Sequence, residues 1–345
     1  MIVWLILIVY LFFIRIIMGP CITQKSRKVF LILAGIGIVF VMGSRFPQYK
    51  VVYDLEIYYH YYGMARKLSW IGLFKYSRFE PGYAIMNKIV STLVPWDQFI
   101  LYFEAAFCVG CTFSFIHRNT EDVFLGVLVY VLLGSMGFQL TAFRQAFAMS
   151  ICLLSVEKVK QRKFIPFLLM VLLAASMHKV AIVFLPAYYI LRRPINRKEN
   201  LLSMIIICLS PFFAKAATML GNQVLHMNYE GYIGNEYGGL VPILIYFIII
   251  IYSYITANRL DNRVGLNMLI PGLAIYLMRY TTVALERVSF FYTIGAATAL
   301  PEALRAEKDG KIKVFLKIFA AVLLIVLFIY RLTYAEYVNY RFFWE

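Results

Sequence analysis

Long apolar runs separated by short charged turns make up most of this 345-residue chain. The runs are continuous, without alternating polar positions, and many are about 15 to 20 residues long, as membrane-spanning helices are. The pattern therefore predicts an all-α polytopic membrane protein with about 11 to 12 transmembrane segments. The expected segments lie near residues 1–18, 28–44, 98–116, 122–139, 144–158, 163–177, 180–191, 200–217, 240–258, 264–279, 288–304 and 312–331.

Two of these segments differ from an ordinary span. Residues 1–18 have no basic leader and no small-residue cleavage site, so we expect a first transmembrane helix rather than a signal peptide. Segments 163–177 and 180–191 are short enough to be half-helices that meet around His178.

The basic residues gather in alternate loops, near 25–28, 118, 158–163, 192–198, 259–263 and 305–313. Short loops rich in Lys and Arg remain in the cytoplasm, which predicts that this side is cytoplasmic and that both termini lie outside. The longer connections 45–97 and 218–239 are then extracytoplasmic loops within a single integral membrane domain, residues 1–345. The first of them is rich in tyrosine and is expected to carry amphipathic helices that lie on the membrane.

The composition of the chain limits which kinds of molecule can be its binding partners. The chain is 62% apolar and carries a net charge of +16. Because the positive charge lies in loops between apolar runs, no nucleic-acid partner is expected, and anionic membrane lipids and an anionic substrate fit better. Cys108 and Cys111 have the spacing of a metal or redox pair, but they lie within an apolar segment and are expected to be buried hydrophobic residues.

Several ionisable residues fall at the predicted outer face, where their cost makes a functional role the default hypothesis. Arg144 and Gln145 begin a helix, whose free N–H groups attract phosphate, and the arginine adds a bidentate donor. The alternative is an interfacial arginine that reaches lipid headgroups. His178 is a candidate general base or phosphate donor, against the alternative of a structural histidine.

Further charged residues lie at the same predicted face. Arg279, Glu286 and Arg287 bound another outer connection, and a structural salt bridge is the alternative there. Arg45 begins the first outer loop. The carboxylates of Asp54 and Glu80 in that loop, beside many tyrosines, are what a carbohydrate site uses, whereas an interfacial aromatic belt explains most of the tyrosines.

Glu104 is expected roughly two helical turns below this face, about 9 Å deep. The chain has no nucleotide-binding loop, no GxSxG elbow, no HExxH motif and no cluster with metal-ligand spacing, so no cofactor and no metal are expected.

The stretch FRQAFAMSICLLSVEKVKQRKFIPFLLMVLLAASMHKVAIVFLPAYYIL, from Phe143, resembles the EpsG family of Wzy-like polysaccharide polymerases. FEPGYAIMNKIV from Phe79 resembles the acidic-Gly-Tyr element of the family, and ERVSFFY from Glu286 resembles its late Arg-aromatic element. The resemblance covers roughly residues 45 to 300. In this family an Arg is often followed by Gly-x-Asp-x-x-x-Tyr; here Arg45 is followed by FPQYKVVYDLEIY, so Asp54 and Tyr58 are the nearest matches and the glycine is missing.

The resemblance implies a GT-C-like architecture and a metal-independent glycosyltransferase at the outer face of a bacterial cytoplasmic membrane. A glycan on undecaprenyl pyrophosphate would be transferred to another lipid-linked repeat unit, giving exopolysaccharide, capsule or O-antigen. Donor and acceptor are then lipid-linked glycans, and a chain-length regulator is a further candidate partner.

The candidate roles follow from this chemistry, since fixed cations stabilise a leaving pyrophosphate and a base activates the acceptor hydroxyl. The residues expected to bind pyrophosphate are Arg144, Gln145, Arg279, Arg287 and Arg45. The candidate catalytic residues are His178, Glu286 and Glu80. The residues expected to bind saccharide are Asp54, Tyr58, Glu104 and Tyr83.

Three other functions compete with polymerisation. An O-antigen-type ligase uses the same chemistry with a different acceptor. A flippase of lipid-linked oligosaccharide should carry charged groups exposed alternately to both faces, whereas here they gather at one. A membrane acyltransferase would need a histidine that a cytoplasmic acyl donor can reach, and His178 is predicted on the other side.

Overall fold

The computed structural model describes residues 2–19, 23–47, 53–194, 196–225, 239–332 and 340–345, except for the side chains of 53, 54, 224 and 225. Within these ranges every regular element is a helix, and the only β pairing is an isolated antiparallel bridge between Arg45 and Phe342. The prediction of an all-α protein is therefore confirmed.

The helices follow the apolar runs. The first half of the chain forms α1 (Ile2–Met18), α2 (Gln24–Gly43), α3 (Tyr53–Lys67), α4 (Trp70–Tyr76), α5 (Pro81–Leu93), α6 (Phe99–Asn119), α7 (Val123–Leu132), α8 (Ser135–Thr141) and α9 (Phe143–Lys160). The second half forms α10 (Phe164–Met177), the 3-10 helix η1 (Lys179–Phe184), α11 (Ala187–Ile190), α12 (Arg197–Leu209), η2 (Ser210–Phe213), α13 (Ala214–Leu225), α14 (Leu240–Ile255), η4 (Ala257–Arg259), α15 (Val264–Leu277), η5 (Met278–Tyr280), α16 (Ala284–Thr293), α17 (Ala296–Arg305) and α18 (Gly310–Leu332).

Four of the described helices have the length and hydropathy to cross a membrane, namely α2, α6, α18 and the run Arg197–Gln223 formed by α12, η2 and α13. The pair α7 and α8 counts as a fifth, bent by 49°. Five further apolar helices have 10 to 17 residues: α1, α10, η1 with α11, α14, and α15 with η5. The chain is thus a multi-pass membrane protein, and the count of about 11 to 12 spans remains a prediction.

The bend between α7 and α8 lies at Gly134, where φ is 113°. Residues with a Cβ rarely adopt this conformation, whereas glycine does so without a steric cost. A Cβ here would also lie 2.7 Å from a guanidinium nitrogen of Arg331. The glycine therefore both turns the segment and admits the arginine of α18.

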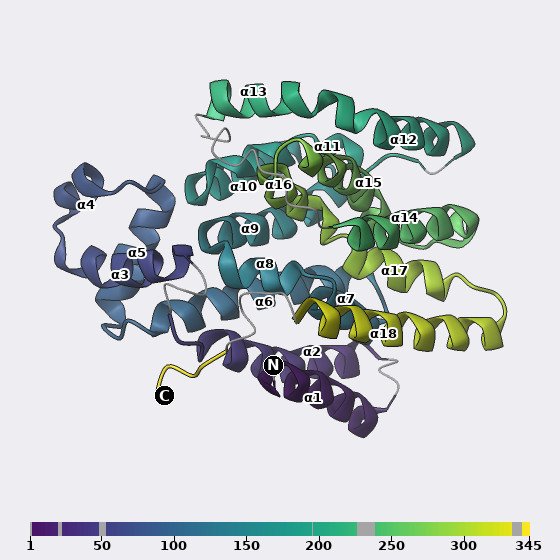
Figure 1. The fold of residues 1–345 in the computed structure, drawn as a ribbon, viewed down its shortest axis with the longest axis horizontal. Coiled ribbons are helices and arrows are strands. Elements are labelled where there is room, and N and C mark those ends of the chain that lie inside the picture. Colours follow the sequence, from purple (N-terminus) through teal and green to yellow (C-terminus); the bar gives the residue numbers. More distant parts are fainter. Residues whose placement is uncertain (1, 20–22, 48–52, 195, 226–238, 333–339) are drawn as a thin grey trace.

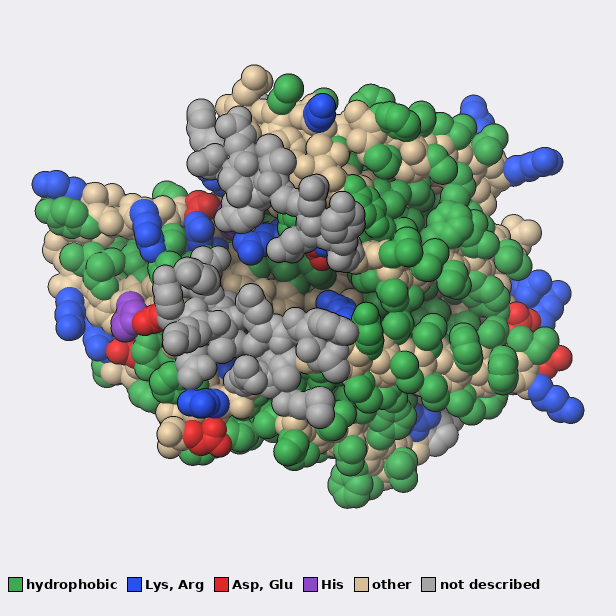
Figure 2. All heavy atoms as spheres, in the orientation of Figure 1, with side chains coloured by type: hydrophobic (Ala, Val, Ile, Leu, Met, Phe, Trp, Pro, Cys, Tyr) green, Lys and Arg blue, Asp and Glu red, His purple; other side chains and the backbone are tan. Residues whose placement is uncertain are grey.

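The long helices lie side by side, so their ends form two opposite faces (Figure 1). The end of α1 and the start of α2 lie at one end, at the right of the view, together with the turn from α17 to α18 and the start of α12. We call this end the basic face, since it carries Arg27, Arg118, Lys160, Arg193 and Arg305. We call the other end the α3–α5 face, after the three helices that cover it. Figure 2 shows hydrophobic side chains over much of the bundle between these ends.

The predicted loop 45–97 contains three helices, α3 to α5, as expected for an amphipathic region. Tyr62 and Leu73 are fully buried within this group of helices. By contrast, Trp70, Ile71 and Phe74 of α4 are 51%, 82% and 53% exposed, as on a helix that lies on a membrane. The second predicted loop, 218–239, begins inside α13, and its residues 226–238 lie outside the described ranges.

Candidate active site

Three separate elements bring one predicted residue each to the same place on the α3–α5 face. Glu80 directly precedes α5 and makes no side-chain capping bond there, so its carboxylate is available for other partners. Arg144 lies in the first turn of α9. His178 ends α10 in an extended conformation, with φ −156° and ψ 118°, and η1 begins at the next residue.

The close approach of α5 to α10 depends on Gly82. A Cβ at this position would lie 2.8 Å from the backbone oxygen of Ser176, a distance that real Cβ atoms essentially never show. Glycine therefore lets the first turn of α5 lie against α10, and this positions Glu80 within reach of His178.

The carboxylate of Glu80 joins the other two side chains. Its Oε1 lies 3.1 Å from His178 Nδ1 and also accepts a hydrogen bond of 3.3 Å from the backbone N–H of Lys179. Its Oε2 accepts a hydrogen bond from Arg144 Nη1. The three side chains are 14% to 22% exposed, so the cluster is largely withdrawn from water but still reachable.

The charges of this cluster define its protonation. Burial raises the pKa of Glu80, but the hydrogen bond from His178 and the charge of Arg144 outweigh it and lower the pKa to about 2. Burial lowers the pKa of His178, the hydrogen bond with Glu80 raises it, and the charge of Arg144 lowers it again. The net result is a pKa below the usual value for histidine. His178 is therefore neutral at pH 7. Because the ionised Glu80 only accepts hydrogen bonds, the proton of His178 sits on Nδ1, and Nε2 carries a lone pair that can act as a base.

Aromatic rings enclose the arginine of the cluster. The guanidinium carbon of Arg144 lies 4.7 Å from the ring centre of Phe79, and its Nε donates a 3.3 Å hydrogen bond to the Tyr58 hydroxyl. Tyr83 is fully buried beside Tyr58, and its hydroxyl has no hydrogen-bond partner among the described residues. Tyr58 and Tyr83 both belong to the buried aromatic core beneath the cluster, and Tyr58 positions Arg144 through its hydroxyl.

A second cluster on the same face contains Arg279. Its Nη1 lies 3.1 Å from Glu286 Oε2 and donates a 2.9 Å hydrogen bond to the Tyr276 hydroxyl. Arg287, beside Glu286, accepts a 2.7 Å hydrogen bond at its backbone oxygen from Gln145 Nε2. Since Gln145 follows Arg144, a continuous series of contacts joins the two clusters.

Arg279 and Glu286 line a pocket of about 520 Å³ between α7, α14, α15 and α18. The pocket also includes Arg331, which donates no hydrogen bond to a described residue. The rest of its wall is largely apolar, with Leu133, Leu240 and Leu327 among its residues. It therefore places two cations and the carboxylate of Glu286 at one end of an apolar chamber.

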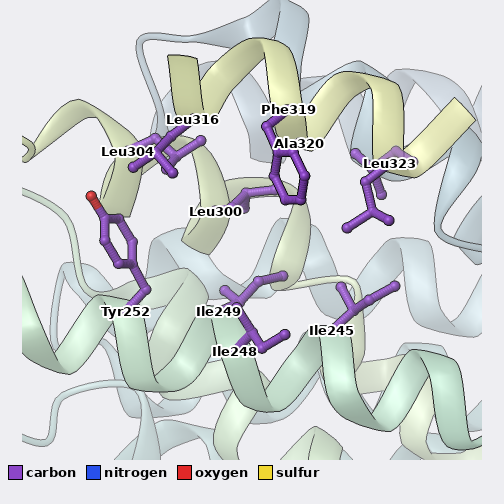
Figure 3. Close-up of a pocket in the computed structure, with 11 residues that line it drawn as sticks. Ile245, Ile248, Ile249, Tyr252, Leu300, Leu304, Leu316, Phe319, Ala320 and Leu323 are labelled. Carbon is purple, nitrogen blue, oxygen red and sulfur yellow. The ribbon is translucent and has the colours of Figure 1, made fainter. Parts of the chain in front are cut away.

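A smaller apolar cavity, of about 160 Å³, lies further along the bundle. Ile245 lines both. Figure 3 shows Ile248 and Ile249 of α14 facing Phe319 and Leu323 of α18 across this cavity. No charged group lines it, so it suits a hydrocarbon chain rather than a reaction.

Other predicted site residues lie elsewhere. Arg45 and Glu104 form a buried pair with 3.8 Å between Nη2 and Oε2, and Arg45 also bonds the backbone oxygens of Met42 and Leu140. The guanidinium carbon of Arg45 lies 5.9 Å from the ring centre of Phe143, and the ring of Tyr58 stacks on the Phe143 ring. The pair is thus buried in the interior, and the rings of Phe143 and Tyr58 connect it with Arg144. The side chain of Asp54 lies outside the described residues.

Arg331 is the site residue that the sequence interpretation missed. It ends the last long apolar run, and a charged side chain at the end of such a run was the available signal. Among the described residues, no group of three or more His, Cys, Asp or Glu side chains is arranged to hold a metal ion.

Comparison with known proteins agrees with the resemblance in the sequence. No curated protein and no solved structure matches the chain. The EpsG family matches residues 28–343, and it is a family of Wzy-like proteins of the polysaccharide polymerase type. With its helical membrane bundle, the chain is therefore a membrane protein of polysaccharide biosynthesis and belongs to the EpsG family.

Proposed function

We propose that this protein is a glycosyltransferase that polymerises undecaprenyl-pyrophosphate-linked repeat units at the α3–α5 face, which lies outside the cytoplasmic membrane. The observation that carries the proposal is the Glu80 carboxylate bridging His178 and Arg144. It brings together an oriented base and a cation at the surface of a membrane bundle. The base can activate the acceptor hydroxyl, and the cation can stabilise a leaving diphosphate.

In the proposed reaction, Nε2 of His178 takes the proton of the acceptor hydroxyl. The acceptor oxygen forms a new bond to the anomeric carbon of the donor, and the bond from that carbon to the diphosphate breaks. Glu80 is a positioning residue, because a group with a pKa of about 2 is a poor base and its hydrogen bond holds the imidazole with Nδ1 protonated.

The two arginines of the 520 Å³ pocket, Arg279 and Arg331, are proposed to bind the diphosphate of the lipid carrier. The apolar wall of the pocket, and the neighbouring cavity between α14 and α18, would hold the first part of its isoprenoid chain. Arg144 bonds Tyr58 through Nε and Glu80 through Nη1, and its guanidinium is proposed to face the diphosphate from the catalytic side. The contacts from Gln145 to Arg287 couple the two locations.

The proposal is tested by the lipid-linked saccharides of cells that lack the protein and carry wild type, Arg144→Ala or His178→Ala. We expect polymer with wild type, and single lipid-linked repeat units with both variants, although the variant proteins are present in the membrane. Wild-type amounts of polymer from Arg144→Ala would remove this arginine from the site.

The same measurement separates the rival functions. Accumulated lipid-linked polymer that is not transferred further would indicate a ligase. Repeat units that stay on the cytoplasmic leaflet would indicate a flippase. Either result would contradict polymerisation.

A further inference from the structure

A second, charged cavity lies at the basic face, far along the bundle from the candidate active site. It measures about 750 Å³ and is lined by residues from several helix ends. Five of these are cations and four are carboxylates: Arg27, Lys28, Arg118, Lys160 and Arg305, with Glu121, Glu157, Asp261 and Glu302. The cavity is therefore a polar chamber where the membrane surface is expected.

The carboxylates of this chamber are already paired. Arg305 contacts three of them, Glu121, Asp261 and Glu302. Glu157 lies between Arg118 and Lys160, at 3.7 and 3.8 Å. No carboxylate of the lining is thus left to attract a further cation.

Lys28 differs from the other cations of the lining, because no hydrogen-bond or ion-pair partner for it lies within the described ranges. Close to it, Nδ1 of His117 is buried and has no hydrogen-bond partner among the described residues. The unpaired ammonium group of Lys28 favours an anionic group that accepts hydrogen bonds.

An apolar groove begins at these same residues. It runs between α2 and α6, measures about 680 Å³, and shares Lys28, Ser114 and His117 with the charged chamber. Its walls include Ile32 and Ile36, which are 62% and 60% exposed on the membrane side of the bundle.

The length of the groove matches one leaflet. On α2 it extends from Lys28 to Phe40, which is about 18 Å at the helical rise per residue. Half of a hydrocarbon core that is about 30 Å thick is of similar depth. Gly110 opens the groove on α6, since a Cβ there would meet no atom within 4 Å.

We infer that the charged chamber and the α2–α6 groove together form a binding site for an anionic phospholipid of the leaflet at the basic face. Lys28 binds the phosphate, the chamber holds the headgroup, and the groove holds an acyl chain. Charge complementarity selects this occupant, because the unpaired lysine stands where the polar and apolar parts of the site meet. The site is separate from the proposed reaction and does not depend on it.

The test uses the purified full-length protein in detergent with equal amounts of phosphatidylglycerol and phosphatidylcholine, and counts retained lipids by native mass spectrometry. We expect wild type to retain phosphatidylglycerol in preference. Lys28→Ala should lower the affinity for it about fivefold. Lys25→Ala removes the same charge from the same helix outside both cavities and should change the affinity less than twofold.

Gly110→Leu tests the groove independently of charge, since a Cβ there meets no atom within 4 Å and the longer side chain would occupy the groove. We expect it to reduce retained phosphatidylglycerol, with unchanged elution of the folded protein. Equal retention of both lipids by wild type, or equal losses in Lys25→Ala and Lys28→Ala, would overturn the inference. So would a change from dimer to monomer in Gly110→Leu with lipid retention unaltered, because the groove would then be an interface between two copies.

Discussion

Glu80 controls both the orientation and the charge of His178. Its carboxylate oxygen Oε1 accepts a hydrogen bond of 3.1 Å from Nδ1 of His178, so Nε2 is left for the substrate. It also favours the imidazolium that forms when Nε2 takes a proton, since an opposite charge nearby raises the pKa of a histidine. A carboxylate that orients and stabilises a catalytic histidine is a recurring arrangement in hydrolases on unrelated folds.

A prediction about pH follows from this pair. Neutral His178 is the active form, so the rate of polymerisation should be constant above the lowered pKa of His178 and fall as the pH drops through it. Glu80→Gln removes the main interaction that raises the pKa of His178. The acid limb of the profile should therefore move to lower pH, while the maximal rate falls about tenfold or more. The measurement is the pH profile of polymerisation in membranes.

The chain offers a matched control for this substitution. Glu56 lies 3.4 Å from His60 in an exposed pair on α3, so Glu56→Gln makes the same chemical change away from the cluster. It should leave both rate and profile unchanged. An unshifted acid limb in Glu80→Gln would show that His178 is a structural residue and not the base.

Arg331 allows a second prediction about a single side chain. If it binds the diphosphate, Arg331→Ala should raise KM for the lipid-linked substrate about tenfold or more, the cost of one hydrogen bond to a charged group. Arg331→Lys should recover part of the loss. Arg341→Ala removes an exposed arginine from the same face and should have little effect; equal effects of the two alanine variants would contradict a specific role.

At the scale of elements, the site depends on how closely α5 lies against α10. Gly82→Ala forces these helices apart, because the added Cβ would meet the backbone of Ser176. We expect polymer formation to fall strongly. The protein should still fold, because α5 is not one of the long helices that form the bundle. Gly310→Ala adds a methyl group at the start of α18, where no atom lies within 4 Å, and should be active. Polymer yields of both variants, compared at equal protein amounts, check the prediction.

At the scale of the whole molecule, the two faces should lie on opposite sides of the membrane. Lys75 of α4 and Lys308 beside α18 are exposed at the α3–α5 and basic ends, respectively. In a background with Cys21 and Cys208 replaced by Ser, an impermeant maleimide should label Lys75→Cys in intact cells and Lys308→Cys only after lysis. The reverse pattern would place the candidate active site in the cytoplasm.

The bundle as a whole was predictable because its signals are local. The length of an apolar run and the basic residues beside it act within one segment, and they give the helical class and the grouping of loops. The break at His178 was also readable, since two short runs adjoin a polar pair. The bend at Gly134 was not, because a single glycine in an apolar run does not reveal its φ.

The candidate residues Glu80, Arg144 and His178 were identified one at a time from their polar character at segment ends. That one carboxylate joins them was decided by tertiary structure alone, since Glu80 lies 64 positions from Arg144 and 98 from His178. Packing α5 against the ends of α9 and α10 brings them together, and the same packing separates Arg45 and Glu104 into their own buried pair. The sequence alone determined which segments form apolar helices, because the length and hydropathy of an apolar run are properties of each segment. Which charges meet depends on how the segments pack.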